Sequence, residues 1–204
     1  MNDSNMNSLL KWGVENSKVS NGADAKTQLN QEALAALFGG NQKSDAQMMK
    51  EMMEVVQDEE AKLENRIVAF DNFEQLIENL DNANNIESLK LWTPLVEQLE
   101  NKNAELRTFA AWCCATAVSN NIRTQERLLI VGAIPILVRM AIEDTDKKAR
   151  KKAILALSSS VRNFQAGLDE AVSHMPAEFK PQEKLDANDM DSVDVLINKL
   201  RESV

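Results

Sequence analysis

The chain has 204 residues, 44% of them hydrophobic, and carries a formal net charge of −9. This length can bury one sizeable core or build one elongated array. The acidic balance argues against nucleic acid or an anionic membrane as the partner. With 6 Gly, 4 Pro and no Tyr, the composition favours helices over strands. The charge is uneven: residues 1–100 hold 18 acidic and 8 basic side chains, and residues 101–204 hold 14 and 15.

The cysteines Cys113 and Cys114 are neighbours in an apolar stretch that reads as helix. Adjacent helical side chains point about 100° apart, so these two cannot form a normal disulfide with each other. They are the only cysteines in the sequence, which favours a reducing compartment. The sequence has no apolar run of membrane-spanning length and no signal-like start. We therefore expect a cytoplasmic protein, with the nucleus as the alternative, and no membrane segment.

Residues 1–43 are expected to form a flexible segment with two short amphipathic stretches. The first lies within residues 1–16, and the second ends at Gly39-Gly40. Between them, residues 17–29 are polar and patternless, which is typical of a linker.

Beyond residue 43 the sequence repeats itself. Three predicted long helices, Arg66–Asn79, Arg107–Asn120 and Arg150–Asn163, align at steps of 41 and 43 residues. Shorter helices are expected between them, and one opens with Gly132 and Pro135, a helix stop followed by a first-turn proline. A period near 42 with three helices per unit is typical of armadillo repeats.

The predicted fold class is therefore all-α, an armadillo-like α-solenoid, a right-handed superhelix of short helical repeats. The array is expected over residues 44–181, with a C-terminal capping helix in residues 182–204.

Residues that could support catalysis are scarce. His174 is the only histidine, and there is no Gly-rich phosphate loop or nucleophile elbow. Neither an enzyme nor a cofactor or metal is expected. The basic run Lys147–Lys152 follows two acidic residues. It is interpreted as a solvated helix start, or as a contact for an acidic protein surface rather than for nucleic acid.

Asparagines recur where the long helices are expected to end, at Asn79, Asn120 and Asn163. One interpretation is C-capping, because asparagine tolerates left-handed backbone. The other is a polar ladder along a groove lined by the long helices. The two interpretations are compatible. Around Asn79 the polar cluster exceeds what capping needs, and it is expected to form the helix end and its turn.

Several stretches resemble the fungal Fes-type nucleotide exchange factors of the cytosolic heat-shock protein 70 chaperone, relatives of the animal Hsp-binding protein. The most specific is FDNFEQLIENLDNANNI, which begins at Phe70. NSLLKWGVENS at Asn7, ALAALFGG at Ala33 and MMKEM at Met48 also fit. The resemblance covers essentially the whole chain, and the chain ends like the shorter fungal members, without the further repeats of longer ones.

The resemblance implies that the groove embraces one lobe of the chaperone's ATPase domain and is incompatible with a closed nucleotide cleft. ADP then leaves faster, which supports substrate release and protein folding. It also implies that Leu9, Leu10, Lys11 and Trp12 occupy the chaperone's peptide site; the alternative is that this segment folds back onto the array.

We expect the chaperone-binding residues to come from the polar cluster and its equivalents in later repeats. They are Glu78, Asn79, Asp81, Asn82, Ala83, Asn84, Asn85, Asn120, Asn121, Arg162 and Asn163. Ala83 is the small residue among them, so Ala83→Arg is expected to block binding with an almost unchanged melting temperature. The chain is expected to be monomeric.

The alternative function is an armadillo-type peptide-binding adaptor, or a scaffold without effect on nucleotide. A tryptophan ladder, usual in peptide-binding arrays, is missing. Trp112 aligns with Asp71 and Leu155.

Overall fold

The computed structural model describes residues 10–14 and 43–204. The chain divides into two compact units, Met1–Ser44 and Asp45–Val204. In the first, residues 10–14 are helical. The expected linker at residues 17–29 and the second amphipathic stretch lie outside the described residues. All regular secondary structure in the described part is helical, so the all-α prediction is confirmed.

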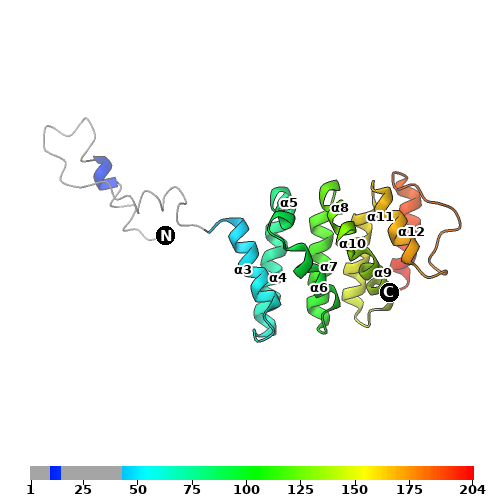
Figure 1. Ribbon diagram of the computed structural model, residues 1–204, viewed down its shortest axis with the longest axis horizontal. Helices are drawn as coiled ribbons and strands as arrows, with labels where there is room; N and C mark the ends of the chain where they lie inside the picture. The colour runs from blue at the N-terminus through cyan, green and yellow to red at the C-terminus, as the bar shows by residue number, and fades with distance from the viewer. Residues whose placement is uncertain (1–9, 15–42) are drawn as a thin grey trace. The chain divides into compact units, whose positions relative to one another are not determined.

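The second unit begins with α3 (Asp45–Gln57) and continues as groups of short and long helices (Figure 1). The long helices are α4 (Leu63–Ile77), α7 (Ala104–Val118) and α10 (Lys147–Val161). The shorter helices are α5 (Leu80–Ser88), α6 (Trp92–Glu97), η1 (Gln98–Glu100), α8 (Ile122–Ile130), α9 (Ala133–Glu143), α11 (Gln165–His174) and α12 (Met190–Glu202).

The long helices begin about one turn before the predicted arginines and end before the predicted asparagines. Two of their starts are fixed by side-chain caps: Asn103 Oδ1 accepts from the Glu105 and Leu106 amides, and Asp146 caps α10 in the same way, whereas α4 follows Lys62 without a side-chain cap. Two of their ends are fixed by left-handed residues, Asn120 with φ 51° and Asn163 with φ 55°. The capping interpretation is therefore confirmed for these two asparagines.

The long helices lie side by side in Figure 1, with α7 packed against α4 on one side and α10 on the other. Helix α3 covers the other side of α4, and α12 packs on α10. Gly132 has φ 72° and precedes α9, where Pro135 lies in the first turn as predicted. Each long helix thus stacks on its equivalent in the neighbouring group, as expected for a helical array.

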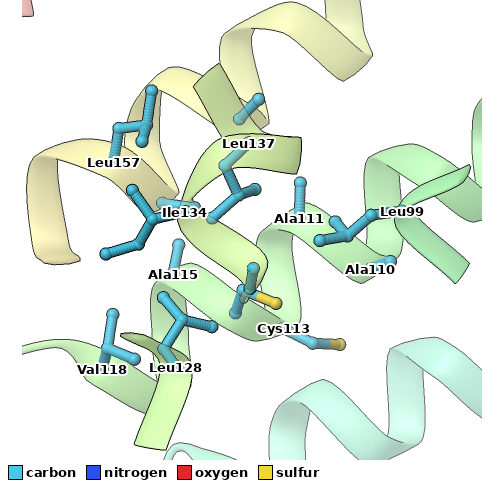
Figure 2. Packing of buried hydrophobic residues seen from close by; sticks show 14 of the residues in the cluster. Leu99, Ala110, Ala111, Cys113, Ala115, Val118, Leu128, Ile134, Leu137 and Leu157 are labelled. Carbon is cyan, nitrogen blue, oxygen red and sulfur yellow. The ribbon is translucent and has the colours of Figure 1, made fainter. Parts of the chain in front are cut away.

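Small side chains allow α7 and α10 to approach closely. Ala110 and Ala111 of α7 and Ala153 of α10 are fully buried. Figure 2 shows Ala110 and Ala111 in the same core as larger residues of η1, α8 and α9. Cys113 and Cys114 are free, buried thiols in this core. Burial raises the pKa of both thiols, that of Cys114 to about 12, so they are protonated packing residues.

The arginine that recurs in each long helix ties that helix to the preceding one. Arg66 Nε donates to the Val56 carbonyl at 2.8 Å, and Arg150 Nε donates to the Ala141 carbonyl at 3.0 Å. Arg107 Nη1 donates to the Asn101 carbonyl at 2.8 Å, just after η1. These bonds satisfy carbonyls near the ends of helices, where they lack partners inside the helix.

Candidate protein-binding surface

One face of the long helices remains open to solvent. Residues at helical spacing on α4, α7 and α10 are all at least partly exposed, whereas Leu106, Cys113 and Ala117 on another side of α7 are buried. We call this surface the long-helix face. It comprises Glu64, Ile67, Val68, Asp71 and Gln75 of α4 with its C-cap Glu78; Glu105, Thr108, Phe109, Trp112 and Thr116 of α7 with its C-cap Ser119; and Lys148, Lys151, Lys152, Leu155 and Ser159 of α10 with its C-cap Arg162.

Aromatic rings occupy the centre of this face. Phe109 stacks on Trp112 with ring centroids 5.8 Å apart, and on Phe70 at 6.2 Å. Lys152 Nζ lies 3.2 Å from the centroid of the Trp112 ring, a cation–π contact between α7 and α10. Burial lowers the pKa of Lys152, although the nearby Glu74 carboxylate acts in the opposite direction. A half-exposed tryptophan held between a ring and an ammonium group is the kind of rigid anchor on which partners dock.

The buried carboxylate of Glu74 lies beneath the same part of the long-helix face. It is 4% exposed, and its Oε1 accepts a hydrogen bond from Thr116 Oγ1 at 2.5 Å. This bond joins α4 to α7, and the carboxylate also attracts the Lys152 ammonium group of α10. The three long helices are thus connected by polar and aromatic contacts across the face, which fixes the positions of its side chains.

The predicted polar cluster does not form a turn; that prediction was wrong. Residues 80–88 form helix α5, and Asn79 is its N-cap, with Oδ1 accepting from the Asp81 amide at 2.9 Å. Asn79 therefore differs from Asn120 and Asn163, because it starts a helix in extended backbone rather than ending one in left-handed backbone. Glu78, Asp81 and Asn85 are exposed beside it.

Two members of the cluster face inward. Ala83 is 3% exposed and Asn82 is 7% exposed. Asn82 Nδ2 donates to Asp45 Oδ2 at 2.7 Å and to the Leu76 carbonyl at 3.0 Å, which ties α5 to α3 and α4. The expectation that Ala83 is a contact for the partner is therefore not supported, since its neighbours in the fold already cover it.

In the next repeat, the predicted site residue Asn121 makes a contact within the fold and is not part of an open polar ladder. Asn121 is 7% exposed, and its Nδ2 donates to Asn84 Oδ1 at 3.2 Å, which joins α8 to α5. Asn84 is half-buried. The structure thus brings these two predicted site residues together, but the side-chain amide of Asn121 bonds to Asn84 instead of facing a partner.

Asn120, Arg162 and Asn163 line one hollow of about 400 Å³ together with Ser119, Ile122, Gln125 and Ser159. Gln125 Nε2 donates to the Ser159 and Arg162 carbonyls at 2.8 and 3.0 Å, which shapes its wall. The Arg162 guanidinium pairs with Asp194 of α12. The structure therefore brings three predicted residues together, although Arg162 is partly held by its ion pair with α12.

Sequence reasoning missed Phe109, Trp112, Lys152 and Glu74 as parts of a common surface. The signal was present in the repeat alignment, where Val68, Phe109 and Lys152 share one column. The column has no recurring residue type, and Trp112 has no aligned tryptophan, so the alignment alone does not indicate a common surface.

In the N-terminal unit, Leu9 lies outside the described residues. Leu10 is 60% exposed, Lys11 is exposed and Trp12 is half-buried. Among the described residues no group of His, Cys, Asp or Glu is arranged to hold a metal ion. No described helix has the length and apolar character needed to cross a bilayer.

The fold and the long-helix face define a helical-repeat protein with an open, structured surface. Residues 6–86 match the family described as nucleotide exchange factor Fes1. The chain is 50% identical to the "Hsp70 nucleotide exchange factor FES1" of Gibberella zeae, over 100% of this chain and 99% of the relative. It is 50% identical to the protein of that name from Coccidioides immitis, over 98% of both chains. The Saccharomyces cerevisiae protein of that name is 44% identical over 78% of this chain and 57% of its own length. The chain belongs to the Fes1 family of nucleotide exchange factors.

Proposed function

We propose that this chain is a nucleotide exchange factor that binds the ATPase domain of the cytosolic heat-shock protein 70 chaperone and accelerates ADP release. The observation that carries the proposal is the 50% identity, over nearly the full length of both chains, to a relative named for this activity. Exchange needs no catalytic residue, because binding alone can change nucleotide affinity.

The physical mechanism is thermodynamic linkage. If the chain binds the open, nucleotide-free ATPase domain more tightly than the ADP-bound domain, ADP binds the complex more weakly by the same factor. A rigid binding surface serves this purpose, since a partner must adapt to it. Stacked rings, the Glu74–Thr116 hydrogen bond and the arginine ties give the long-helix face that rigidity.

The proposed contact surface is the long-helix face together with the exposed helix ends beside it. Asn82 and Ala83 are left out because both are buried, and Asn121 because it is buried against Asn84. Glu78 and Arg162 already belong to the long-helix face. The other predicted residues that we keep are Asn79, Asp81, Asn84 and Asn85 at α5, and Asn120 and Asn163 after α7 and α10.

Stopped-flow release of fluorescent ADP from the purified chaperone tests the function. Addition of this chain is expected to accelerate release by at least about tenfold, in line with typical coupling free energies of 1–3 kcal/mol. Binding without acceleration would favour the alternative of a scaffold or adaptor.

For the N-terminal segment we propose that Leu9, Leu10, Lys11 and Trp12 compete for the chaperone's peptide site. The exposed Leu10 and the short helix at residues 10–14 support this, because so short a helix unwinds readily into an extended peptide. Replacing Leu9, Leu10 and Trp12 by serine should leave ADP release intact and slow the release of a fluorescent substrate peptide. Equal peptide release by both proteins would reject the proposal.

We further propose that the protein acts as a monomer in the cytoplasm, with neither nucleic acid nor membrane as a partner. Two buried, free cysteines fit a reducing compartment, and the net charge of −9 fits a protein partner better than a polyanion. Analytical ultracentrifugation of the purified chain tests the oligomeric state, and the mass of a monomer is expected at every concentration.

A further inference from the structure

The long-helix face carries its charges in a fixed order, and we propose that this order sets the orientation in which the partner docks. The inference rests on the proposed function, because it takes the chaperone's ATPase domain as the partner. It adds that this domain presents basic groups to α4 and acidic groups to α10, on either side of an apolar contact with Phe109 and Trp112.

The α4 end of the face is acidic. Its three charged side chains are Glu64, Asp71 and Glu78, each about two helical turns after the one before it. Asp71 accepts a hydrogen bond from Gln75 at 2.9 Å. Within residues 43–204 none of the three forms an ion pair, so their charge faces outward.

The α10 end is basic. Lys148 and Lys151 are exposed and form no ion pair with any described residue. Lys152 lies over Trp112, and Arg162 is paired with Asp194. Between the two ends, α7 contributes Glu105 and otherwise uncharged side chains to the face. The equivalent positions Glu64, Glu105 and Lys148 therefore change sign across the array.

The stability of α10 does not explain these lysines. Lys148 lies in the first turn of the helix, where a positive charge opposes the helix macrodipole. Lys148, Lys151 and Lys152 also lie three and four residues apart, where like charges repel. The chain thus retains an arrangement that is unfavourable for folding, as is common for surfaces that serve a partner.

Charge order of this kind acts mainly on orientation and association rate. Oppositely charged ends attract a partner of complementary order and repel the reversed orientation, while exposed pairs add little affinity. The apolar centre then supplies contact area for the docked complex.

The test uses charge reversals at both ends of the full chain. Lys148→Glu/Lys151→Glu reverses the basic end, and Glu64→Lys/Glu78→Lys reverses the acidic end. The quadruple variant combines them and keeps the net charge of −9. The control is Lys50→Glu/Lys102→Glu, which changes the net charge as the first variant does at exposed positions off this face. Stopped-flow association with the ATPase domain is measured at low and high salt, and melting by circular dichroism.

At low salt, each of the two end reversals is expected to slow association about tenfold, and the control variant less than about twofold. At high salt, the association rates of all variants should approach that of the natural chain. The quadruple variant should associate at least as slowly as either double variant. Lys148→Glu/Lys151→Glu should melt at or above the temperature of the natural chain, which separates lost docking from lost folding. Normal association by the quadruple variant would overturn the charge-order inference and leave the proposed function standing. If the natural chain failed both to bind and to accelerate ADP release, both proposals would fall.

Discussion

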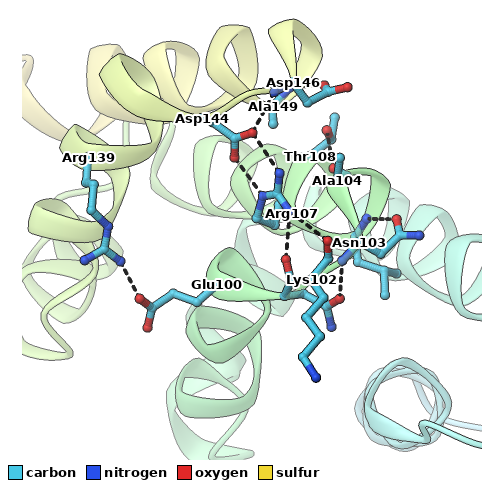
Figure 3. A network of polar contacts seen from close by, with 12 residues as sticks. Glu100, Lys102, Asn103, Ala104, Arg107, Thr108, Arg139, Asp144, Asp146 and Ala149 are labelled. Carbon is cyan, nitrogen blue, oxygen red and sulfur yellow. Dashed lines mark hydrogen bonds and ion pairs between the residues drawn. The ribbon is translucent and has the colours of Figure 1, made fainter.

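At the residue scale, the Arg107–Asp144 pair is the best-formed ion pair in the described part of the array. Arg107 Nε donates to Asp144 Oδ2 at 2.7 Å and Nη2 donates to Oδ1 at 2.8 Å, a bidentate contact between the start of α7 and the end of α9 (Figure 3). The same guanidinium also reaches the Asn101 and Lys102 carbonyls. One side chain thus fixes three segments, which lysine cannot do because it lacks the planar fork.

Arg107→Lys is accordingly expected to lower the free energy of unfolding by about 1–3 kcal/mol at neutral pH. Chemical denaturation measures the loss. Lys62→Arg, at an exposed position, serves as a control and should change stability by less than about 0.5 kcal/mol.

The same pair predicts a pH dependence. Partial burial acts to raise the pKa of Asp144, but the Arg107 hydrogen bond, the bond from the Asp146 amide and the positive charges of Arg107 and Arg150 together outweigh burial, so the pKa is lowered. A lowered pKa means that the pair stabilises the fold above the ordinary aspartate value of about 3.9 and that this stability is lost as pH falls through the lowered value. The stability gap between the natural chain and Arg107→Lys should therefore shrink below about pH 4. A gap that stayed constant from pH 7 to pH 3 would contradict this account of the pair.

Ala83 gives a second prediction at this scale. Because its side chain is 3% exposed, Ala83→Arg forces a long charged group into packed surroundings, and a loss of about 2–4 kcal/mol is expected. This revises the expectation from sequence that melting would barely change. Asn85→Arg, at an exposed position of the same helix, is the matched control and should keep the melting temperature. Equal melting of the two variants would show that Ala83 is accessible after all.

At the element scale, the long helices were predictable and α5 was not. A repeat near 42 residues and a recurring arginine identify α4, α7 and α10 in the sequence. Residues 80–88 contain several asparagines and have weak helix propensity, so the sequence suggested a turn. The helix forms because Asn79 caps it and because Ala83 and Ile86 are buried, contacts that intrinsic propensity does not include.

The binding surface was predictable only in part for the same reason. The asparagines that recur in the repeat alignment indicate where helices begin or end. The alignment does not show which of their side-chain amides is available to a partner. Asn82 and Asn121 prove to be committed to Asp45 and Asn84, partners 37 residues away in the chain. Long-range contacts of this kind depend on how repeats stack, which local patterns do not encode.

The prediction for binding that belongs to the helices concerns Trp112 of α7. Trp112→Ala removes the ring that contacts both Phe109 and Lys152, so chaperone affinity should fall at least about tenfold, as for interface anchors. Ile130→Ala is the control, since Ile130 is 69% exposed and lies on α8, outside the long-helix face. Titration calorimetry measures both variants. Unchanged affinity of Trp112→Ala would show that the partner docks elsewhere.

At the scale of the whole molecule, function is proposed to follow from shape and rigidity rather than from chemistry. Each long helix is held by its neighbours through buried alanines and by arginines bonded to the preceding segment. A surface built in this way can favour one conformation of a partner, and the difference in its affinity for two conformations is the whole of its effect on nucleotide.

The most direct test of this account is the affinity of the chain for the isolated ATPase domain, measured by calorimetry with and without saturating ADP. We expect the chain to bind at least about tenfold more tightly without nucleotide, and the ADP affinity of the domain to fall by the same factor when the chain is saturating. Equal affinity of the chain for the two states would contradict it, since a partner that does not distinguish the states cannot shift the balance between them.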